Sequence, residues 1–238
     1  MTIDGMRASK ASTAVTPAAN LLVAASTERS WVSRGAHKLI GALDAFGVSP
    51  EGRRCLDAGA STGGFTEVLL DRGAREIVAA DVGYGQLAWS LRSDERVVVM
   101  ERTNVRELTA EAIGGPVDLV VADLSFISLA TVLPALTACA SAQADIVPMV
   151  KPQFEVGKDR VGAGGVVSDP ELRADAVLTV ARRAAELGWH AVDVTASPLP
   201  GPSGNVEYFL RLRSTTDHPL EGDGLVAAIG RAVAEGPQ

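Results

Sequence analysis

The chain has 238 residues, of which 47% are hydrophobic and 21% are charged, and its formal net charge at pH 7 is −7. This composition excludes a disordered chain, and the length fits one large domain or one domain with a small appendage. The negative charge argues against a generally basic nucleic-acid-binding protein, and two cysteines cannot build a disulfide scaffold or a four-cysteine zinc site. We therefore expect a cytoplasmic globular protein without a metal site.

Residues 1–30 differ in composition from the rest of the chain. They are rich in Ala, Ser and Thr, and they predict two short strands, one at Thr2-Ile3-Asp4-Gly5 with its turn and one at Leu21 to Ala25. Two such strands are too little to bury a core of their own. The apolar run at Leu21 to Ala25 is also too short to favour a secretory signal peptide. We expect this segment to be a fragment or an appendage.

From Trp31 onward, segments with a helical apolar period alternate with short apolar strands. The predicted helices are Ala36–Phe46, Phe65–Leu70, Gln86–Leu91, Ile127–Cys139, Glu171–Leu187 and Gly224–Ala234. The predicted strands are Arg54–Asp57, Ile77–Val82, Val97–Met100, Val117–Ala122, Ile146–Val150, His190–Ala196 and Val206–Leu212. This alternation predicts a doubly wound α/β sheet.

The last two predicted strands are joined by residues 197–205 without a helix, so we expect them to be antiparallel. A mostly parallel sheet with one antiparallel strand near the C-terminus is the plan of the S-adenosylmethionine (SAM) methyltransferases rather than of the dehydrogenases. The expected fold class is therefore α/β, with a Rossmann-like SAM methyltransferase sheet.

One segment, Leu124–Ala144, carries no charge and is long enough to span a bilayer. Its Ser, Thr, Gln and Pro residues, and the preceding Asp118 and Asp123, favour a strand end followed by a buried helix instead. We therefore expect no stable association with a membrane.

A glycine-rich turn between Leu56 and Phe65 joins a predicted strand to a predicted helix and brings a ligand close to backbone N–H groups. In the dinucleotide fingerprint G-x-G-x-x-G, the middle glycine lets the backbone approach pyrophosphate, and Ser61 stands there. Asp57 would repel that anion but would attract the cationic amino group of SAM. The turn therefore favours SAM over NAD. Its predicted cofactor-binding residues are Asp57, Gly59, Ala60, Ser61, Thr62, Gly63, Gly64 and Phe65.

Two further strand ends fit a nucleoside. Asp81 closes the second strand, where an acid accepts hydrogen bonds from ribose hydroxyls. Thr103 and Asn104 follow the third strand, and the asparagine amide suits an adenine edge. A structural turn with a helix cap is the competing interpretation of Thr103 and Asn104. All three residues are predicted to bind the cofactor.

Four polar residues stand where the apolar pattern predicts otherwise, and two of them are lysines in a chain with only four lysines. Asp123 and Lys151 end neighbouring strands at the carboxyl edge, where open parallel sheets bind ligands. A reversed last strand brings Glu207 to the same edge, and Lys38 lies in the first helix. Burial beside a second cation lowers the pKa of a lysine, which makes Lys151 the predicted general base. Asp123 and Glu207 would orient the two ammonium groups.

These residues resemble the K-D-K-E tetrad of the FtsJ-type ribose 2′-O-methyltransferases. More closely, four segments resemble the TlyA family: Ser33-Arg34-Gly35-Ala36-His37-Lys38-Leu39, Asp57 to Thr66, Ala122 to Ser128, and Val150-Lys151-Pro152-Gln153-Phe154-Glu155. The resemblance runs from about Arg29 to the C-terminus. It implies that Lys38, Asp123, Lys151 and Glu207 are catalytic and that the glycine turn is the SAM site.

The resemblance also implies a substrate and a domain plan. Members of the family are SAM-dependent 2′-O-methyltransferases that act on cytidines of 16S and 23S ribosomal RNA, and they also carry the name hemolysin. The expected partners are therefore ribosomal RNA or ribosomal subunits. We expect residues 1–28 to be a partial remnant of an alpha-L type RNA-binding domain, residues 29–32 a linker, and residues 33–238 the methyltransferase domain.

Four residues near the reactive edge are predicted to contact RNA. Phe126 follows Asp123 and could stack on a cytosine turned out of its helix, with core packing as the competing interpretation. Arg34, Arg102 and Arg106 flank the motifs and are predicted phosphate contacts, although each could equally be a solvated surface arginine.

Three functions other than RNA methylation stay open. An NAD-dependent oxidoreductase is disfavoured by Asp57 and Ser61. A membrane-active cytolysin would need a spanning or amphipathic element, for which the uncharged segment that follows Asp123 is the only source. An RNA-binding module on an inactive enzyme fold is disfavoured by the intact tetrad.

Overall fold

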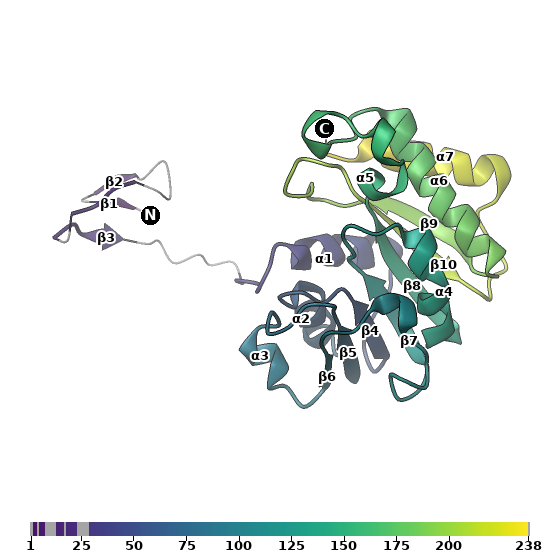
Figure 1. Ribbon diagram of the computed structural model, residues 1–238, viewed down its shortest axis with the longest axis horizontal. Helices are drawn as coiled ribbons and strands as arrows, with labels where there is room; N and C mark the ends of the chain where they lie inside the picture. The colour runs from purple at the N-terminus through teal and green to yellow at the C-terminus, as the bar shows by residue number, and fades with distance from the viewer. Residues whose placement is uncertain (1, 4, 8–12, 17, 23–28, 238) are drawn as a thin grey trace. The chain divides into compact units, whose positions relative to one another are not determined.

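The computed structural model describes residues 2–3, 5–7, 13–16, 18–22 and 29–237. Contacts within the chain divide it into a unit of residues 1–31 and a unit of residues 32–238 (Figure 1). The boundary falls within the predicted linker. The nature of the first unit as a remnant of an RNA-binding domain stays a prediction.

The smaller unit is a sheet of two-residue strands: β1 (Thr2–Ile3), β2 (Met6–Arg7) and β3 (Leu21–Leu22). They pair antiparallel in the order β2-β1-β3. Both N-terminal strands predicted from the sequence are therefore present, although residues 23–25 of the second lie outside the described residues. Leu21 and Leu22 are exposed, in line with a segment too small to bury a core of its own.

The larger unit is built on seven strands in the order β6-β5-β4-β7-β8-β10-β9. All neighbours are parallel except β10, which runs antiparallel to both β8 and β9. The predicted sheet, mostly parallel with one reversed strand near the C-terminus, is confirmed. The strands are β4 (Arg54–Ala58), β5 (Glu76–Ala80), β6 (Val97–Met100), β7 (Val117–Ala122), β8 (Ala140–Val150), β9 (His190–Ala196) and β10 (Tyr208–Arg213).

Helices cover both faces of this sheet (Figure 1). The α-helices are α1 (Gly35–Phe46), α2 (Gly64–Asp71), α3 (Trp89–Arg92), α4 (Leu129–Cys139), α5 (Pro152–Glu155), α6 (Pro170–Glu186) and α7 (Gly222–Glu235). Short 3₁₀ turns lie at η1 (Val105–Glu107), η2 (Lys158–Arg160) and η3 (Ala163–Gly165). One core cluster joins alternate residues of the strands to apolar residues of α4, α6 and α7, as expected when successive strand residues point to opposite faces. Helix α2 contacts β4 and β5. Thr66 of α2 also donates a hydrogen bond to Asp57 of β4, which directly follows Leu56 of the core cluster.

Most element boundaries differ from the sequence prediction by one or a few residues, and three of these differences bear on the site or on the charged residues of the sheet. The helix predicted at Gln86–Leu91 begins only at Trp89, because the preceding segment is extended: Ala88 donates its N–H to Thr62 O, and Leu87 is buried. Strand β8 begins six residues earlier than predicted, at Ala140. Strand β10 begins at Tyr208, so Glu207 precedes the strand instead of starting it.

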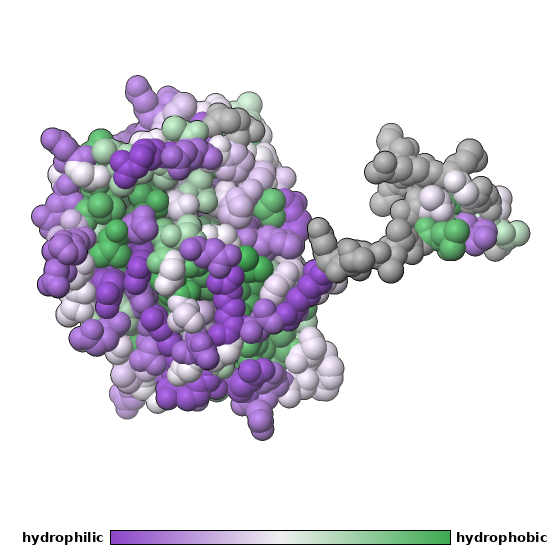
Figure 2. All heavy atoms as spheres, turned by 180° about the vertical axis from the view of Figure 1, so that it is seen from behind, coloured by the Kyte–Doolittle hydropathy of each residue, from purple (hydrophilic) through white to green (hydrophobic). Residues whose placement is uncertain are grey.

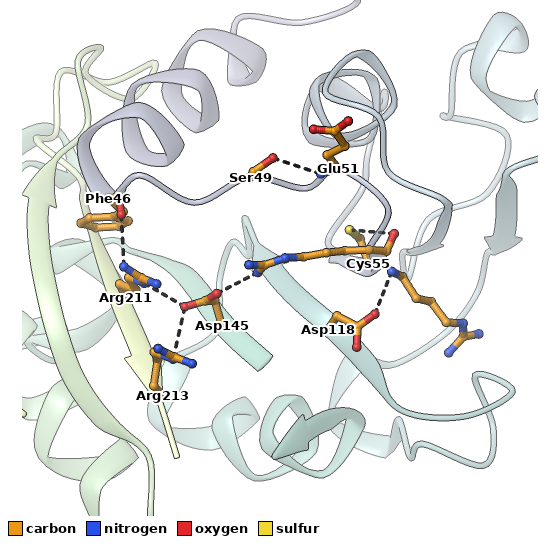
Figure 3. Close-up of polar contacts among 10 residues, drawn as sticks. Phe46, Ser49, Glu51, Cys55, Asp118, Asp145, Arg211 and Arg213 are labelled. Atoms are coloured by element: carbon orange, nitrogen blue, oxygen red, sulfur yellow. Dashed lines mark hydrogen bonds and ion pairs between the residues drawn. The ribbon is translucent and has the colours of Figure 1, made fainter. Parts of the chain in front are cut away.

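A charged cluster sits at the edge of the sheet opposite the carboxyl ends of the parallel strands (Figure 3). The carboxylate of Asp145, which is 2% exposed, accepts hydrogen bonds from Arg53 and Arg211, each at 2.8 Å. Arg213 Nε lies 3.7 Å from the same carboxylate, and Arg211 also donates to Phe46 O. A charge in the middle of β8 is tolerated because three guanidinium groups surround it.

The surface of the larger unit is mixed in character. Figure 2 shows hydrophilic side chains interspersed with hydrophobic ones over the visible face. Within the part of the chain that the structure describes, no helix combines the length and apolar character needed to cross a bilayer. The buried helix predicted in Leu124–Ala144 is confirmed as α4, whose Leu133, Leu136 and Cys139 are fully buried. The strand end predicted before it lies at Ala122, and the segment finishes in the first residues of β8.

Candidate active site

Two adjoining cavities open at the carboxyl edge of the sheet. The first, which we call the lysine cavity, has a volume of about 350 Å³, and the second, the Asp81 cavity, about 590 Å³. Gly59, Ser61, Asp123 and Ser125 line both. The other residues of the lysine cavity are Ser33, Arg34, Gly35, Lys38, Ala60, Thr62, Gly64, Phe65, Lys151, Pro200, Pro202 and Glu207. Those of the Asp81 cavity are Asp81, Val82, Gln86, Asn104, Val105, Arg106, Leu124, Phe126, Ile127 and Val132.

The four residues of the predicted tetrad meet in the lysine cavity as two ion pairs. Lys38 Nζ lies 2.5 Å from Glu207 Oε2, and both side chains are buried. Lys151 Nζ lies 2.6 Å from Asp123 Oδ1. The lysine side chain is 10% exposed and the aspartate side chain 28%, so the second pair is the one open to a ligand.

The fold explains why residues so distant in the sequence come together. Asp123 and Lys151 directly follow the parallel neighbours β7 and β8, so they emerge side by side at one edge. The reversed direction of β10 brings Glu207 to that edge, where its carbonyl accepts a hydrogen bond from Ser197 N at 2.8 Å. Lys38 reaches the site from the first turns of α1.

The glycine turn lies tightly against the end of β7. Gly59 has φ +89°, and a Cβ atom at this position would lie 2.4 Å from Asp123 O. Only glycine therefore allows the turn to approach the strand that carries Asp123. Asp123 N in return donates to Ala58 O at 3.1 Å. The turn and the second ion pair are thus parts of one packed unit.

Asp81 is held by backbone N–H groups on both sides. Its Oδ2 accepts from Ser61 N at 2.8 Å, and its Oδ1 accepts from Gly83 N at 2.6 Å. The carboxylate lines its cavity and has lone pairs left for further donors. The N–H of Ser61 is already engaged by an acid, so it is not free to bind a phosphate as a dinucleotide turn requires.

Asp57 lies beneath the turn and does not line either cavity. It is fully buried and accepts a hydrogen bond from Thr66 Oγ1 at 2.6 Å, while its Oδ1 has no hydrogen-bond partner among the described residues. Burial raises the pKa of Asp57 to about 7, although the Thr66 hydroxyl opposes the shift. Direct contact between Asp57 and a cationic ligand stays a prediction.

The two residues predicted after the third strand occupy different places. Asn104 lines the Asp81 cavity, but its side chain accepts from Arg106 N at 3.2 Å and donates to Glu107 at 2.9 Å. It thus caps the short η1 turn, as the competing interpretation stated. Thr103 lines neither cavity and donates its hydroxyl to Glu101 O at 3.1 Å.

Of the four predicted RNA contacts, Arg34, Arg106 and Phe126 each line one of the two cavities, and Arg102 lines neither. Arg34 lines the lysine cavity and Arg106 lines the Asp81 cavity, and both are exposed. Arg102 lies over the ring of Tyr84 at 4.2 Å. Phe126 is 91% exposed and has φ +64°. Core packing, the competing interpretation of Phe126, is therefore wrong.

The sequence did not reveal two polar residues of this edge. Ser125 accepts a hydrogen bond from Lys151 Nζ at 2.9 Å, and Glu155 joins the segments that follow β7 and β8. Both stand within quoted motifs, but their partners depend on loop geometry that spacing does not give. Among the described residues, no group of three His, Cys, Asp or Glu side chains is arranged to hold a metal ion.

Comparison with known proteins gives one family and several relatives. Residues 31–214 match the FtsJ-like methyltransferase family. The 16S/23S rRNA (cytidine-2′-O)-methyltransferase TlyA of Mycobacterium tuberculosis H37Rv is 73% identical over 235 residues, which are 99% of this chain and 88% of the relative. Hemolysin A of Brachyspira hyodysenteriae is 38% identical over 75% of each chain. The solved structure of a Streptococcus thermophilus protein described as a hemolysin has 38% identity and a TM-score of 0.82, and covers 88% of this chain and 76% of that one.

Proposed function

The chain belongs to the FtsJ-like methyltransferase family, together with the TlyA proteins, and we propose that it is a SAM-dependent 2′-O-methyltransferase of cytidines in 16S and 23S ribosomal RNA. One observation carries the chemistry of this proposal: two lysine–carboxylate pairs lie in a cavity that adjoins a second cavity lined by a strand-end acid. The substrate follows from the 73% identity to a relative named for that reaction.

The residues of the Asp81 cavity and of the glycine turn fit SAM. The Asp81 carboxylate suits the two hydroxyls of a ribose, because its bonds to Ser61 N and Gly83 N fix its orientation. Ser61 N is engaged by Asp81, so the turn offers no free phosphate cradle, which suits a ligand without phosphate. We propose that Gly59, Ala60, Ser61, Thr62, Gly64 and Phe65 hold the methionine part and that Asp81 and Asn104 hold the nucleoside. Gly63, Asp57 and Thr103 line neither cavity, and their proposed role is to support the residues that do.

SAM, when bound, supplies a methyl group on a sulfonium centre that a hydroxyl oxygen can attack in line. The chain's own residues must position that hydroxyl and receive its proton. The more open pair, Lys151 with Asp123, can hold the hydroxyl through the ammonium group. The buried pair, Lys38 with Glu207, adds a second positive charge and its carboxylate partner to the same cavity.

We propose Lys151 as the group that takes the proton of the 2′-hydroxyl. Its ammonium must first lose a proton, and the carboxylate 2.6 Å away is the nearest acceptor in the cavity. Asp123 is for the same reason the alternative base. The comparison of an arginine at position 151 with the native lysine, described in the Discussion, separates the two assignments.

Ribosomal RNA or a ribosomal subunit is the proposed partner, and a cytoplasmic location follows from such a partner. Phe126 offers an exposed ring beside the reactive pair for a base turned out of its helix. Arg34, Arg102 and Arg106 would contact phosphates around it. Residues 1–28 are proposed to add RNA contacts as part of an alpha-L type domain.

The experiment that tests this function maps ribose methylation on ribosomal RNA from cells with and without the gene. We expect 2′-O-methylation of a cytidine in each subunit to be lost in its absence and restored by the wild-type gene, but not by a Lys38→Ala variant. Unchanged methylation at every site would contradict the proposal. Calorimetry with the purified protein adds a second arm, since binding of NAD without binding of SAM would favour the oxidoreductase.

A further inference from the structure

The segments that follow β7 and β8 run side by side and are joined at three levels. Nearest the sheet, Lys151 pairs with Asp123 at 2.6 Å. Farther along, the rings of Phe154 and Phe126 lie with their centroids 5.3 Å apart. At the far end, Glu155 reaches from α5 to the start of α4. The pair of Lys151 and Asp123 carries the proposed chemistry, whereas the contacts of Glu155 lie at the other end of the two segments.

Glu155 makes two hydrogen bonds to one turn of the neighbouring segment. Its Oε2 accepts from Ser128 Oγ at 2.6 Å, and its Oε1 accepts from Leu129 N at 2.8 Å. Leu129 opens α4, and its N–H has no partner within the helix. Burial raises the pKa of Glu155 while both hydrogen bonds oppose the rise. The carboxylate therefore occupies a half-buried position only because these two donors meet it.

Glu155 lines neither the lysine cavity nor the Asp81 cavity. It can therefore influence methyl transfer only through the residues it connects. Ser128 is the fifth residue after Asp123, and Glu155 is the fourth residue after Lys151. Because both segments are this short, a shift of Ser128 relative to Glu155 changes the distance between Asp123 and Lys151.

We propose that Glu155 is a positioning residue, which holds the segment of Lys151 against the segment of Asp123 and so sets the geometry of the reactive pair. The inference rests on the methyltransferase function proposed above. A displacement of about 1 Å at reacting groups can cost about a hundredfold in rate. The loss of Glu155 should therefore lower turnover and leave the binding of SAM intact, because the partners of Glu155, Ser128 and Leu129, belong neither to the glycine turn nor to the Asp81 strand end.

The test compares Glu155→Ala with Glu155→Gln. Glutamine can accept from Leu129 N through its oxygen and donate to Ser128 Oγ through its amide, so it keeps both links without the charge. We expect Glu155→Ala to lower kcat about 10-fold to 100-fold, with the Kd of SAM within about threefold of wild type. Glu155→Gln should stay within about threefold of wild type in both measurements.

A matched control removes a helix cap of the same type elsewhere. Asp169 accepts from Glu171 N at 2.8 Å at the start of α6 and lines neither cavity. Asp169→Ala should keep the wild-type kcat. If Glu155→Ala does not fold, Glu155→Asp serves in its place, because the shorter carboxylate cannot reach both donors and should lower kcat in the same direction.

A double-mutant cycle supplies the readout that a purely structural role would not move. In a Lys151→Arg background the proton acceptor that Glu155 is proposed to position is already absent, so the further change Glu155→Ala should cost less than threefold. Full independence of the two effects would overturn the proposal, as would a wild-type kcat in Glu155→Ala. Equal losses of kcat in Asp169→Ala and Glu155→Ala would show general loosening instead. A wild-type enzyme that methylates no ribosomal RNA would refute the proposed function, a result distinct from all of these.

Discussion

The two ends of the central sheet pair their carboxylates with different cations. At the carboxyl edge, lysines pair with Glu207 and Asp123. At the opposite edge, Asp145 is surrounded by Arg53, Arg211 and Arg213 (Figure 3). Arginine keeps its proton at any ordinary pH, whereas a lysine can release one when its surroundings favour the neutral form. A chain with only four lysines thus has two of them in the cavity of the proposed proton transfer, and arginines around the buried carboxylate at the opposite end.

The largest expected effect comes from removing the carboxylate that the three arginines share. Asp145→Ala leaves three guanidinium groups without their common partner, and removal of one side of a buried ion pair costs about 3–5 kcal/mol of the free energy of unfolding. For a chain of this size the midpoint of thermal unfolding should fall by about 10 °C. Calorimetry or a denaturant titration measures the loss.

The control for this change is Asp94→Ala, which removes a surface partner of Arg96 and should shift stability far less. SAM affinity, measured well below the melting temperature, should match wild type in both variants. If Asp145→Ala were as stable as wild type, the three arginines would be surface charges without a common structural role.

The next effect in size comes from exchanging the cations between the two ends. Lys151→Arg keeps the charge but cannot accept a proton, so methyl transfer should fall by about a hundredfold or more while the Kd of SAM stays near wild type. The reciprocal change, Arg53→Lys, should leave turnover within about twofold, because Arg53 bonds Asp145 through a single nitrogen at 2.8 Å. Single-turnover methylation of ribosomal RNA measures both. Nearly full turnover in Lys151→Arg would assign the proton to Asp123 or to water.

The smallest expected effect, taken per pH unit, concerns a fourth carboxylate, Asp57, which is buried and has no cation partner among the described residues. Its pKa is raised from 3.8 to about 7 in the folded protein, so between about pH 4 and pH 7 the folded state binds more protons than the unfolded state. Stability from this group is therefore complete at low pH and is lost as the pH rises, with a slope of at most about 1.4 kcal/mol per pH unit. Relative to Asp57→Asn, the wild type should lose stability across this range. A difference that does not vary with pH would mean that Asp57 stays ionised throughout.

The sequence predicted most of the fold because strand ends, glycines and apolar periods are local features. It placed Asp123, Lys151 and Glu207 at one edge, since strand direction decides which strand ends meet there, whereas Lys38 of the first helix joined them through the family resemblance. The prediction failed where a residue distant in the sequence determines the local conformation or permits the burial of a charge. The early start of β8 escaped prediction because Asp145 looks incompatible with a buried strand until the arginines of other segments surround it.

The short length of α3 and the contacts of Glu155 escaped prediction for the same reason. Residues 86–88 have a helical pattern, but Ala88 is fixed in an extended conformation by Thr62 on the glycine turn. Glu155 reads as an ordinary charged residue of a short helix, and only the position of α4 supplies its two donors. In each case the deciding partner is more than twenty residues away in the sequence.

The reversed strand has a consequence for the order in which the chain is built. Strand β9 hydrogen-bonds to the sheet only through β10, which is synthesised after it. Glu207, the partner of Lys38, likewise follows it in the chain by 169 residues. A growing chain that already contains Lys38, Asp123 and Lys151 therefore still lacks the acid of its buried pair, with an unattached β9 beside a sheet that ends at β8. Insertion of β10 closes both gaps in one event, so catalytic competence and completion of the sheet should arrive together.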